Sequence, residues 1–477
     1  MNNAVPSPGL SVTGQKLPGL RAQVSWALFD FARSPYLSLV YIFVFPNYFA
    51  NTVVGDPVRG QEYWSIANTC VGILVALLAP LLGAISDRMG RRKPWLLSVV
   101  AVMSVCCALL WYSMPGARTG LSVYQILTLI VVLASCFQFT EVFYNAFMPT
   151  LVRPERMGLW SGIGISTAQF GTFVCLIVML LGVALPASGV TLGGLLPSAP
   201  LFGLNPALEE HNRIAGPVAG AWLLVFSLPL ALFTPDGPSN NVCLGAAITG
   251  GMRQLITTVQ RARELKNVGL FLLARMLYTD GKVAILAYSG IYATGTFGWD
   301  LVSILLFAIS LSPCSILGGL GGGWLNDRIG AKRALVLAII LCSICLLIAI
   351  SCAKNQLFFL PYDSAAPLWA FPYFRTLPQA VFIVAVMLMG SGITAAFAIS
   401  RTFMAQIAPL SMLNQFYGLY ALSGTATGFL GHATVGLFTS WFASQRAGFA
   451  SPLILLFGGL LLILPVREER SPELQID

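Results

Sequence analysis

Charged residues are scarce in this chain of 477 residues, where Asp, Glu, Lys and Arg together make up only 9%. A soluble domain carries about 25% charged residues. Hydrophobic residues reach 57% here, and so little polar surface cannot cover a soluble fold. The composition therefore excludes an ordinary soluble protein and predicts that lipid surrounds most of the chain.

The chain also has few of the residues that form catalytic and metal sites. Its two histidines, His211 and His432, are far apart, and it has no phosphate-binding loop or nucleophile elbow. Most of the ten cysteines lie inside apolar runs without metal-ligand spacing. That placement is typical of small buried hydrophobic residues rather than of zinc ligands or disulfides. We therefore expect no enzyme activity, no metal ion and no cofactor.

Long apolar runs are what the chain has in abundance. A membrane-spanning helix needs roughly 20 mostly apolar residues. The runs are too long for barrel strands and show no two-residue alternation. They lie near residues 24–50, 64–86, 95–114, 121–147, 158–183, 217–234, 268–296, 300–324, 333–353, 379–405, 414–441 and 448–466. The sequence thus predicts an all-α polytopic membrane protein with 12 transmembrane helices.

Two stretches break this series of apolar runs. Residues 184–216 are rich in Gly, Pro and Leu, which predicts a long external loop with room for a short surface helix. Residues 235–267 open on a turn signal and continue into a basic stretch, which fits an amphipathic helix on an anionic membrane face or a solvated linker helix. The predicted organisation is a tail at 1–23, an N-terminal half at 24–234, a linker at 235–267, a C-terminal half at 268–466 and a tail at 467–477.

The net charge of +9 is explained by membrane topology. If the N-terminus is inside, 17 of the 27 Lys and Arg residues fall in inside segments, six in outside loops and four within helices. This asymmetry predicts that both termini are cytoplasmic, so no nucleic-acid partner is needed. The expected partners are the lipid bilayer and a small-molecule substrate, with protons as a candidate coupling ion. A monomer is the default expectation.

An internal repeat relates the two halves. The run Gly-x-x-x-Asp-Arg-x-Gly at 83–90 follows the second predicted helix, and a similar run at 323–330 follows the eighth. Two further pairs recur in the same order at offsets of 260 and 250 residues: Pro149 with Pro409, and Asp30 with Asp280. Three matches at nearly the same offset indicate that helices one to six and seven to twelve are copies.

The run at 83–93 resembles the signature loop of the major facilitator superfamily. The resemblance implies two six-helix halves that rock around a midplane site. It also implies a gate in which Asp87 and Arg91 brace the cytoplasmic ends of helices in one state of the cycle; the alternative is a charge cluster that only fixes topology. The gate candidates are Gly83, Asp87, Arg88, Gly90, Arg91, Asp327 and Arg328.

A narrower resemblance is to the vacuole-effluxer family and its bacterial relatives. It rests on motifs at 26–34, 144–149 and 416–424, among others spread over nearly the whole chain. The resemblance implies efflux of small solutes, with amino acids the usual proposal. The first-helix motif departs from the family pattern, because Phe31 and Arg33 replace its usual residues.

Several polar residues lie inside predicted helices, where burial is costly and side chains rarely face lipid. The candidates for substrate or coupling-ion contacts are Asp30, Arg33, Glu141, Tyr144, Asn145, Tyr278, Asp280 and Arg401. Lys282 and His432 are further ionisable residues in these helices. Asp30 and Arg33 are three residues apart, so they share a helix face and could pair. Solvation of Asp30 near the membrane edge is the alternative.

Glu141 and Arg401 are equivalent in the two halves, because each lies eight residues before the proline of its repeat. We therefore predict opposite charges at matching depths, facing the central cavity or its cytoplasmic gate. A carboxylate there could take up and release a proton as its surroundings change. A fixed interhelical ion pair is the structural alternative.

Together these features favour a secondary transporter of small polar solutes, working by alternating access as an exporter of amino acids or related metabolites in a bacterial inner membrane. Two alternatives stay open. One is a non-transporting receptor or membrane assembly factor of the same fold. The other is a lipid or drug translocator, which the intramembrane charges disfavour because they predict a polar cavity.

Overall fold

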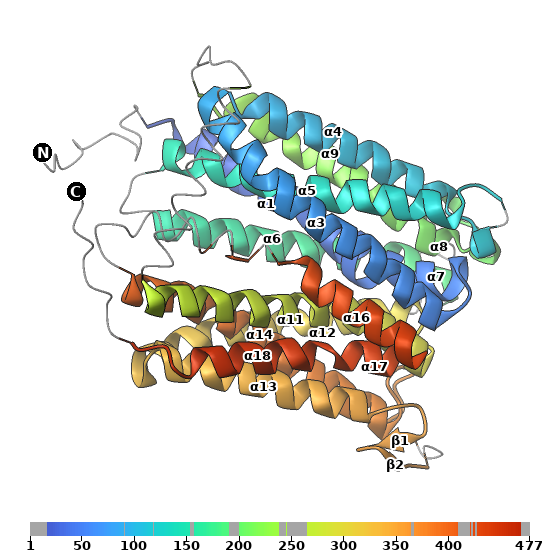
Figure 1. Ribbon diagram of the computed structural model, residues 1–477. Helices are drawn as coiled ribbons and strands as arrows, with labels where there is room; N and C mark the ends of the chain where they lie inside the picture. Colours follow the sequence, from blue (N-terminus) through green and yellow to red (C-terminus); the bar gives the residue numbers. More distant parts are fainter. Residues whose placement is uncertain are drawn as a thin grey trace, which may run out of the picture. The chain divides into compact units, whose positions relative to one another are not determined.

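A computed structural model describes most of the chain. The described residues are 17–89, 91–117, 119–152, 157–189, 200–237, 245, 265–363, 367–408, 420, 423–424 and 427–468. They are almost entirely helical (Figure 1). They form two compact units, the first made of Met1–Phe45 with Leu77–Gln254 and the second of Pro46–Ala76 with Leu255–Asp477.

The first unit holds the N-terminal helices. They are α1 (Leu20–Pro35), the π-helical η1 (Tyr36–Phe43), the later part of α3 (Pro57–Met89), α4 (Lys93–Leu109), α5 (Val123–Leu151), α6 (Met157–Met179) and α9 (Ala215–Phe233). Short elements lie between them: η3 (Leu110–Tyr112), η4 (Pro115–Ala117), η6 (Leu180–Ala184), α7 (Leu185–Ala187), η8 (Leu201–Gly203), η9 (Pro206–Leu208) and α8 (Glu210–Arg213).

The second unit holds the C-terminal helices and one segment from the N-terminal part of the chain. Its main helices are α11 (Lys266–Phe297), α12 (Leu301–Ile329), α13 (Ala331–Ser351), α14 (Leu377–Ile407), α16 (Phe429–Phe442), α17 (Gln445–Ala450) and α18 (Pro452–Ile463). The N-terminal segment contributes α2 (Phe45–Tyr48), η2 (Phe49–Val53) and the first turns of α3. An antiparallel hairpin of β1 (Gln356–Leu357) and β2 (Leu360–Pro361) follows α13.

Local sequence signals explain where several helices begin. Asp300 caps α12, because its side chain accepts a hydrogen bond from the Ser303 backbone N–H. Thr376 and Gln379 form a capping box at the start of α14. The first span runs from Leu20 to Val53 with π-helical turns rather than as one regular helix. Pro35 and Pro46 remove backbone N–H donors within it, which accounts for the interruption.

Nine helices of the described residues are long and apolar enough to cross a membrane. The prediction of a polytopic helical membrane protein is therefore confirmed. The predicted run at 414–441 is described as a helix only from Phe429, and most of the predicted linker at 235–267 lies outside the described residues. The predicted helix at 448–466 is divided at Ser451 into α17 and α18. The predicted division into halves stays a prediction, and the compact units differ from it in the segment Pro46–Ala76.

That segment is held to the second unit by polar contacts with α16 and α17. Gln61 Nε2 donates to Thr439 Oγ1 at 2.6 Å, and Gln445 Nε2 donates to the Pro57 carbonyl at 2.8 Å. Ser65 donates to the carbonyl of His432. Helices in lipid associate through such small residues and interhelical hydrogen bonds, because no hydrophobic effect drives them together.

In the first unit α1 lies against α6 and α9. Trp222 of α9 donates from Nε1 to the Phe31 carbonyl at 3.1 Å, and the two rings are 5.2 Å apart. Glycine makes the contact with α6 possible, because a Cβ on Gly171 would lie 2.5 Å from Ser34 Oγ. Ser34 of α1 therefore faces α6, and the Phe31 carbonyl faces α9.

In the second unit α12 crosses α14 through glycine, and α13 and α18 lie side by side (Figure 1). A Cβ on Gly318 would lie 2.3 Å from the Ser391 carbonyl oxygen, and a Cβ on Gly322 would lie 2.7 Å from Ala395 Cα. Backbone atoms cannot yield as a flexible side chain can. The glycines of α12 therefore serve close helix packing.

We predict that Gly318→Ala lowers stability by about 1–3 kcal/mol, because the methyl group has no space against α14. Gly321→Ala on the same helix is the matched control, since a Cβ there meets nothing within 4 Å. Alanine is favoured over glycine in a helix by about 1 kcal/mol, so the control should unfold at the same temperature as the parent or slightly higher. Thermal unfolding in detergent measures the midpoints of the two variants. Equal midpoints would contradict the close contact between Gly318 of α12 and α14.

Candidate functional site

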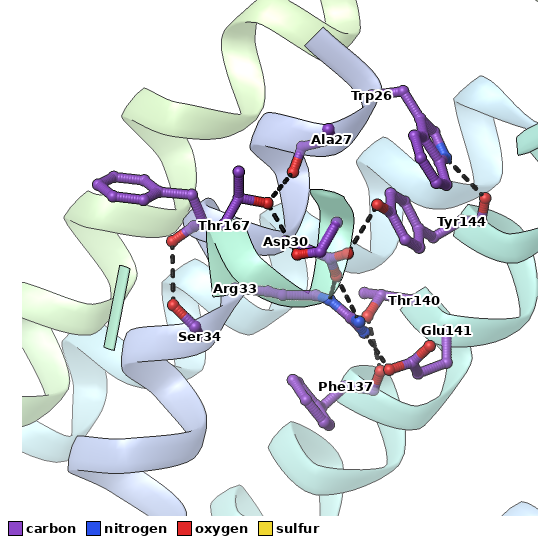
Figure 2. A network of polar contacts seen from close by, with 12 residues as sticks. Trp26, Ala27, Asp30, Arg33, Ser34, Phe137, Thr140, Glu141, Tyr144 and Thr167 are labelled. Atoms are coloured by element: carbon purple, nitrogen blue, oxygen red, sulfur yellow. Dashed lines mark hydrogen bonds and ion pairs between the residues drawn. The ribbon is translucent and has the colours of Figure 1, made fainter. Parts of the chain in front are cut away.

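A buried charge cluster joins α1 to α5 in the first unit (Figure 2). The Arg33 guanidinium contacts Asp30 Oδ1 twice, through Nε at 2.7 Å and Nη2 at 2.6 Å. Its Nη1 forms an ion pair with Glu141 Oε1 at 2.5 Å. One cation is thus shared by two carboxylates from two helices.

Tyr144 fixes the other oxygen of Asp30. Its Oη donates to Asp30 Oδ2 at 2.7 Å. The ring of Tyr144 stacks on Trp26 with centroids 4.7 Å apart, and Trp26 Nε1 donates to the Tyr144 carbonyl at 3.1 Å (Figure 2). Both oxygens of Asp30 therefore have donors, and the carboxylate has one defined orientation.

Helical spacing places these groups. Asp30 and Arg33 are three residues apart on α1, and Glu141 and Tyr144 are three apart on α5, so each pair shares a helix face. Glycine on α6 leaves room for the cluster, because a Cβ on Gly164 would lie 2.7 Å from Asp30 Oδ2.

The three charged side chains differ in exposure. The side chains of Asp30 and Arg33 are 7% and 11% exposed, whereas that of Glu141 is 37% exposed. The rings of Phe137 and Tyr144 flank the guanidinium at 5.5 and 5.2 Å. With both carboxylates ionised the cluster carries one excess negative charge. Glu141 is the member that a proton or a cationic group can reach from outside.

The equivalent region of the second unit is arranged differently. On α11, Arg275 Nη1 donates to the Tyr420 carbonyl at 2.5 Å and to Ser423 Oγ at 2.7 Å. Tyr278 Oη lies 2.7 Å from Ser400 Oγ. Asp280 is 1% exposed, and its carboxylate lies close to the Thr427 hydroxyl and within the field of Arg275.

The structure brings four of the predicted site residues together: Asp30, Arg33, Glu141 and Tyr144. Tyr278 and Asp280 are both buried on α11, and Arg401 lies exposed on α14. The side chain of Asn145 lies outside the described residues. The idea that Glu141 and Arg401 face one cavity stays a prediction, because they lie in different units.

Most of the predicted gate lies outside the described residues. This applies to Gly90 and to the side chains at Gly83, Asp87, Arg88 and Asp327. Arg91 is exposed, and the exposed Arg328 has its guanidinium 5.1 Å from the Trp324 ring. The gate stays a prediction.

Sequence reasoning missed Asp236, which it assigned to a linker turn. Its carboxylate accepts hydrogen bonds from the backbone N–H groups of Arg92 at 2.9 Å and Lys93 at 3.3 Å, at the start of α4. Lys93 Nζ also donates to the Ala231 carbonyl at 2.8 Å. A carboxylate at a helix N-terminus is stabilised by the unsatisfied N–H groups and the helix dipole. The available signal was the start of α4, where Arg92 at the N-cap supplies no capping side chain, so that a cap from elsewhere in the chain was to be expected.

Comparison with solved structures identifies the fold. The fold matches a peptide transporter with a TM-score of 0.64 at 10% identity, covering 94% of this chain and 95% of that one. It matches the nucleoside transporter NupG with a TM-score of 0.61 at 12% identity, covering 94% and 98%. The chain therefore has the major facilitator fold, and it is an integral multi-pass membrane protein.

The particular family follows from the sequence. The model of the family described as vacuole effluxer Atg22-like matches residues 62–475, so the chain belongs to that family. The uncharacterised MFS-type transporter YxiO of Bacillus subtilis is 23% identical over 461 residues, which is 94% of this chain and 95% of YxiO. Autophagy-related protein 22 of Coccidioides immitis is 24% identical over 52% of this chain and 42% of its own length. The family is described as effluxers and YxiO is named as a transporter, which confirms the predicted class of an MFS-type transporter.

We predict that Tyr144→Phe destabilises the protein by about 1–3 kcal/mol, because the buried Asp30 carboxylate loses a donor. The phenyl ring keeps its stacking on Trp26, so the loss reports the hydroxyl alone. Tyr124→Phe is the control on the same helix, because Tyr124 is 76% exposed. Unfolding in a denaturing detergent titration measures the difference. Equal stabilities of the two variants would contradict the hydrogen bond.

Proposed function

We propose that this protein is a secondary transporter that exports small polar solutes, amino acids or related metabolites, across a bacterial inner membrane, with protons as the coupling ion and both termini in the cytoplasm. The observation that carries the proposal is the guanidinium of Arg33 shared between a fixed carboxylate and an accessible one. Membership of a family of vacuole effluxers supports the direction. A D-xylose-proton symporter among the proteins of similar fold supports the ion.

In this proposal Asp30 and Glu141 have different roles. Asp30 is held by Arg33 and Tyr144 and stays the permanent counter-ion. Glu141 makes its ion pair from the more exposed position on another helix. A proton on Glu141 removes one of the two charges that hold Arg33, and the attraction between α5 and α1 falls with it. The strength of the ion pair between α1 and α5 thereby depends on whether Glu141 is protonated. Coupling of transport to a proton gradient requires such a dependence of helix contacts on protonation.

The charges also argue for a polar substrate. Ionisable groups inside a membrane span are expensive, and they face a bundle interior or a water-filled path rather than lipid. A translocator of apolar compounds has no use for such a cluster.

We predict that Glu141→Gln lowers flux by roughly tenfold or more, because an amide cannot take up and release the proton that the cycle requires of this carboxylate. Proteoliposomes loaded with a mixture of labelled amino acids measure efflux with and without an imposed proton gradient. The parent should release at least one amino acid faster than empty liposomes and respond to the gradient, whereas Glu141→Gln should not respond.

Glu62→Gln on α3 is the matched control and should behave as the parent. Unchanged efflux and unchanged gradient response in Glu141→Gln would refute the role of this carboxylate. No efflux of any amino acid by the parent would refute the substrate class.

A further inference from the structure

The internal repeat allows the charge cluster of the first unit to be compared with its counterpart in the second. The offset between matching residues is 250 for α1 and α11, which relates Asp30 to Asp280, and 260 for α5 and α14. The second offset relates Phe137 to Phe397 and Glu141 to Arg401. Each unit therefore has its own counterparts of Asp30, Phe137 and Glu141.

Both units hold a cation of the first repeat helix against the same aromatic position. In the first unit the Arg33 guanidinium lies 5.5 Å from the Phe137 ring. In the second unit Lys282 of α11 lies with Nζ 3.7 Å from the centroid of Phe397, with the Tyr278 ring at 4.9 Å. Cation–π attraction explains why an aromatic residue occupies this place in both repeats.

The difference lies in the carboxylates. Arg33 has Asp30 and Glu141, but Lys282 is 0% exposed and its Nζ has no hydrogen-bond partner among the described residues. Asp280 is two residues away on the helix, and residues at that spacing do not face each other. The position that matches Glu141 holds Arg401, which is a cation. By the offset of 250 residues Lys282 matches Ala32, and the position that matches Arg33 holds Val283. The second unit therefore places a cation of its own against the matching aromatic residue, and the Lys282 ammonium has no carboxylate partner among the described residues.

The buried Lys282 ammonium lacks a hydrogen-bonding anion among the described residues. A buried charge is costly unless it is paired and hydrogen-bonded, and an intramembrane ionisable residue with no partner indicates a functional site. Its position fits a ligand site, because Lys282 is the seventeenth of the 32 residues of α11, at the middle of the helix. Transporter substrates bind near the midplane.

The two rings over the ammonium differ in exposure. Phe397, whose ring lies nearer to Nζ, is 38% exposed, whereas Tyr278 is 0% exposed. Phe397 is therefore the neighbour of the ammonium that reaches the surface of the unit.

We propose that Lys282 is the anchor for a carboxylate of the transported solute and that Phe397 is the side chain that uncovers it. The inference rests on the proposed transport function and narrows it to substrates that carry a carboxylate. The solute supplies to Lys282 the anion that Glu141 and Asp30 supply to Arg33, in a charge-assisted hydrogen bond.

The test compares ligand binding by the parent protein and by Lys282→Met, Lys282→Arg and Lys266→Met. Lys266 is the exposed first residue of α11 and serves as the control. The probes are the L-amino acids, their α-amides, the corresponding decarboxylated amines, sugars and nucleosides, each followed by thermal unfolding in detergent. Only compounds with a carboxylate should raise the midpoint of the parent and of Lys266→Met.

Lys282→Met should weaken the binding of such a compound roughly 10- to 100-fold, since a hydrogen bond to a charged group is lost. Lys282→Arg should restore part of it. Without ligand, Lys282→Met should unfold at the parent's temperature or above it, because an apolar residue replaces an unpaired charge. This combination of intact folding and lost binding separates a ligand anchor from a structural lysine.

Three results of the binding test would overturn the inference. They are a sugar, nucleoside, amide or amine that binds the parent as well as the acid does, an acid that binds Lys282→Met undiminished, and an absence of binding by every carboxylate. Efflux of a neutral solute by the parent would end this inference while leaving the proposed transport function standing. Absence of all efflux would end the transport function itself.

Discussion

The cost of placing charge in a membrane is the constraint on which the rest of the structure depends. A single guanidinium in a spanning helix is expensive, and here Arg33 is compensated by two carboxylates, one on its own helix and one on α5. Tyr144, Trp26 and the small residue at Gly164 are arranged around that compensation. The packing of α1 against its neighbours therefore compensates the buried charge of Arg33 as well as holding the helices together.

The cluster holds two carboxylates and one cation. A purely structural pair would be neutral and closed to solvent, because a half-satisfied buried network is worse than an apolar core. Here the second carboxylate, Glu141, is the most exposed member and lies on a different helix from the cation. In the second unit the ammonium of Lys282 lies against two aromatic rings, without a carboxylate partner among the described residues.

Much of the fold could be predicted because lipid leaves few choices. Long apolar runs must be helices, since every backbone group needs an internal partner, and the repeat of Asp30 in Asp280 predicted two related halves. The π-helical turns of the first span and the hairpin after α13 could not be predicted from apolar length, because they depend on local backbone geometry. The pairing of Asp30 with Arg33 followed from helical spacing and is confirmed.

The partner of Glu141 shows where sequence reasoning ends. Repeat symmetry related Glu141 to Arg401, but it could not show that Arg33, a departure from the family pattern, would reach across from α1 to take that carboxylate. Contacts between helices depend on rotation about each axis, which apolar length does not encode. The role of Asp236 at the start of α4 was missed for the same reason, because the two segments meet only in three dimensions.

The central claim is that the charges of the first unit exist for transport rather than for stability. The most direct test removes all three at once, in a variant with Asp30→Asn, Arg33→Met and Glu141→Gln, and measures its thermal midpoint and its amino-acid efflux in proteoliposomes. The account predicts a folded protein with a midpoint at or above the parent's, since no unpaired charge is left behind, and with no gradient-dependent efflux. Efflux at the parent's rate with an unchanged gradient response would contradict it.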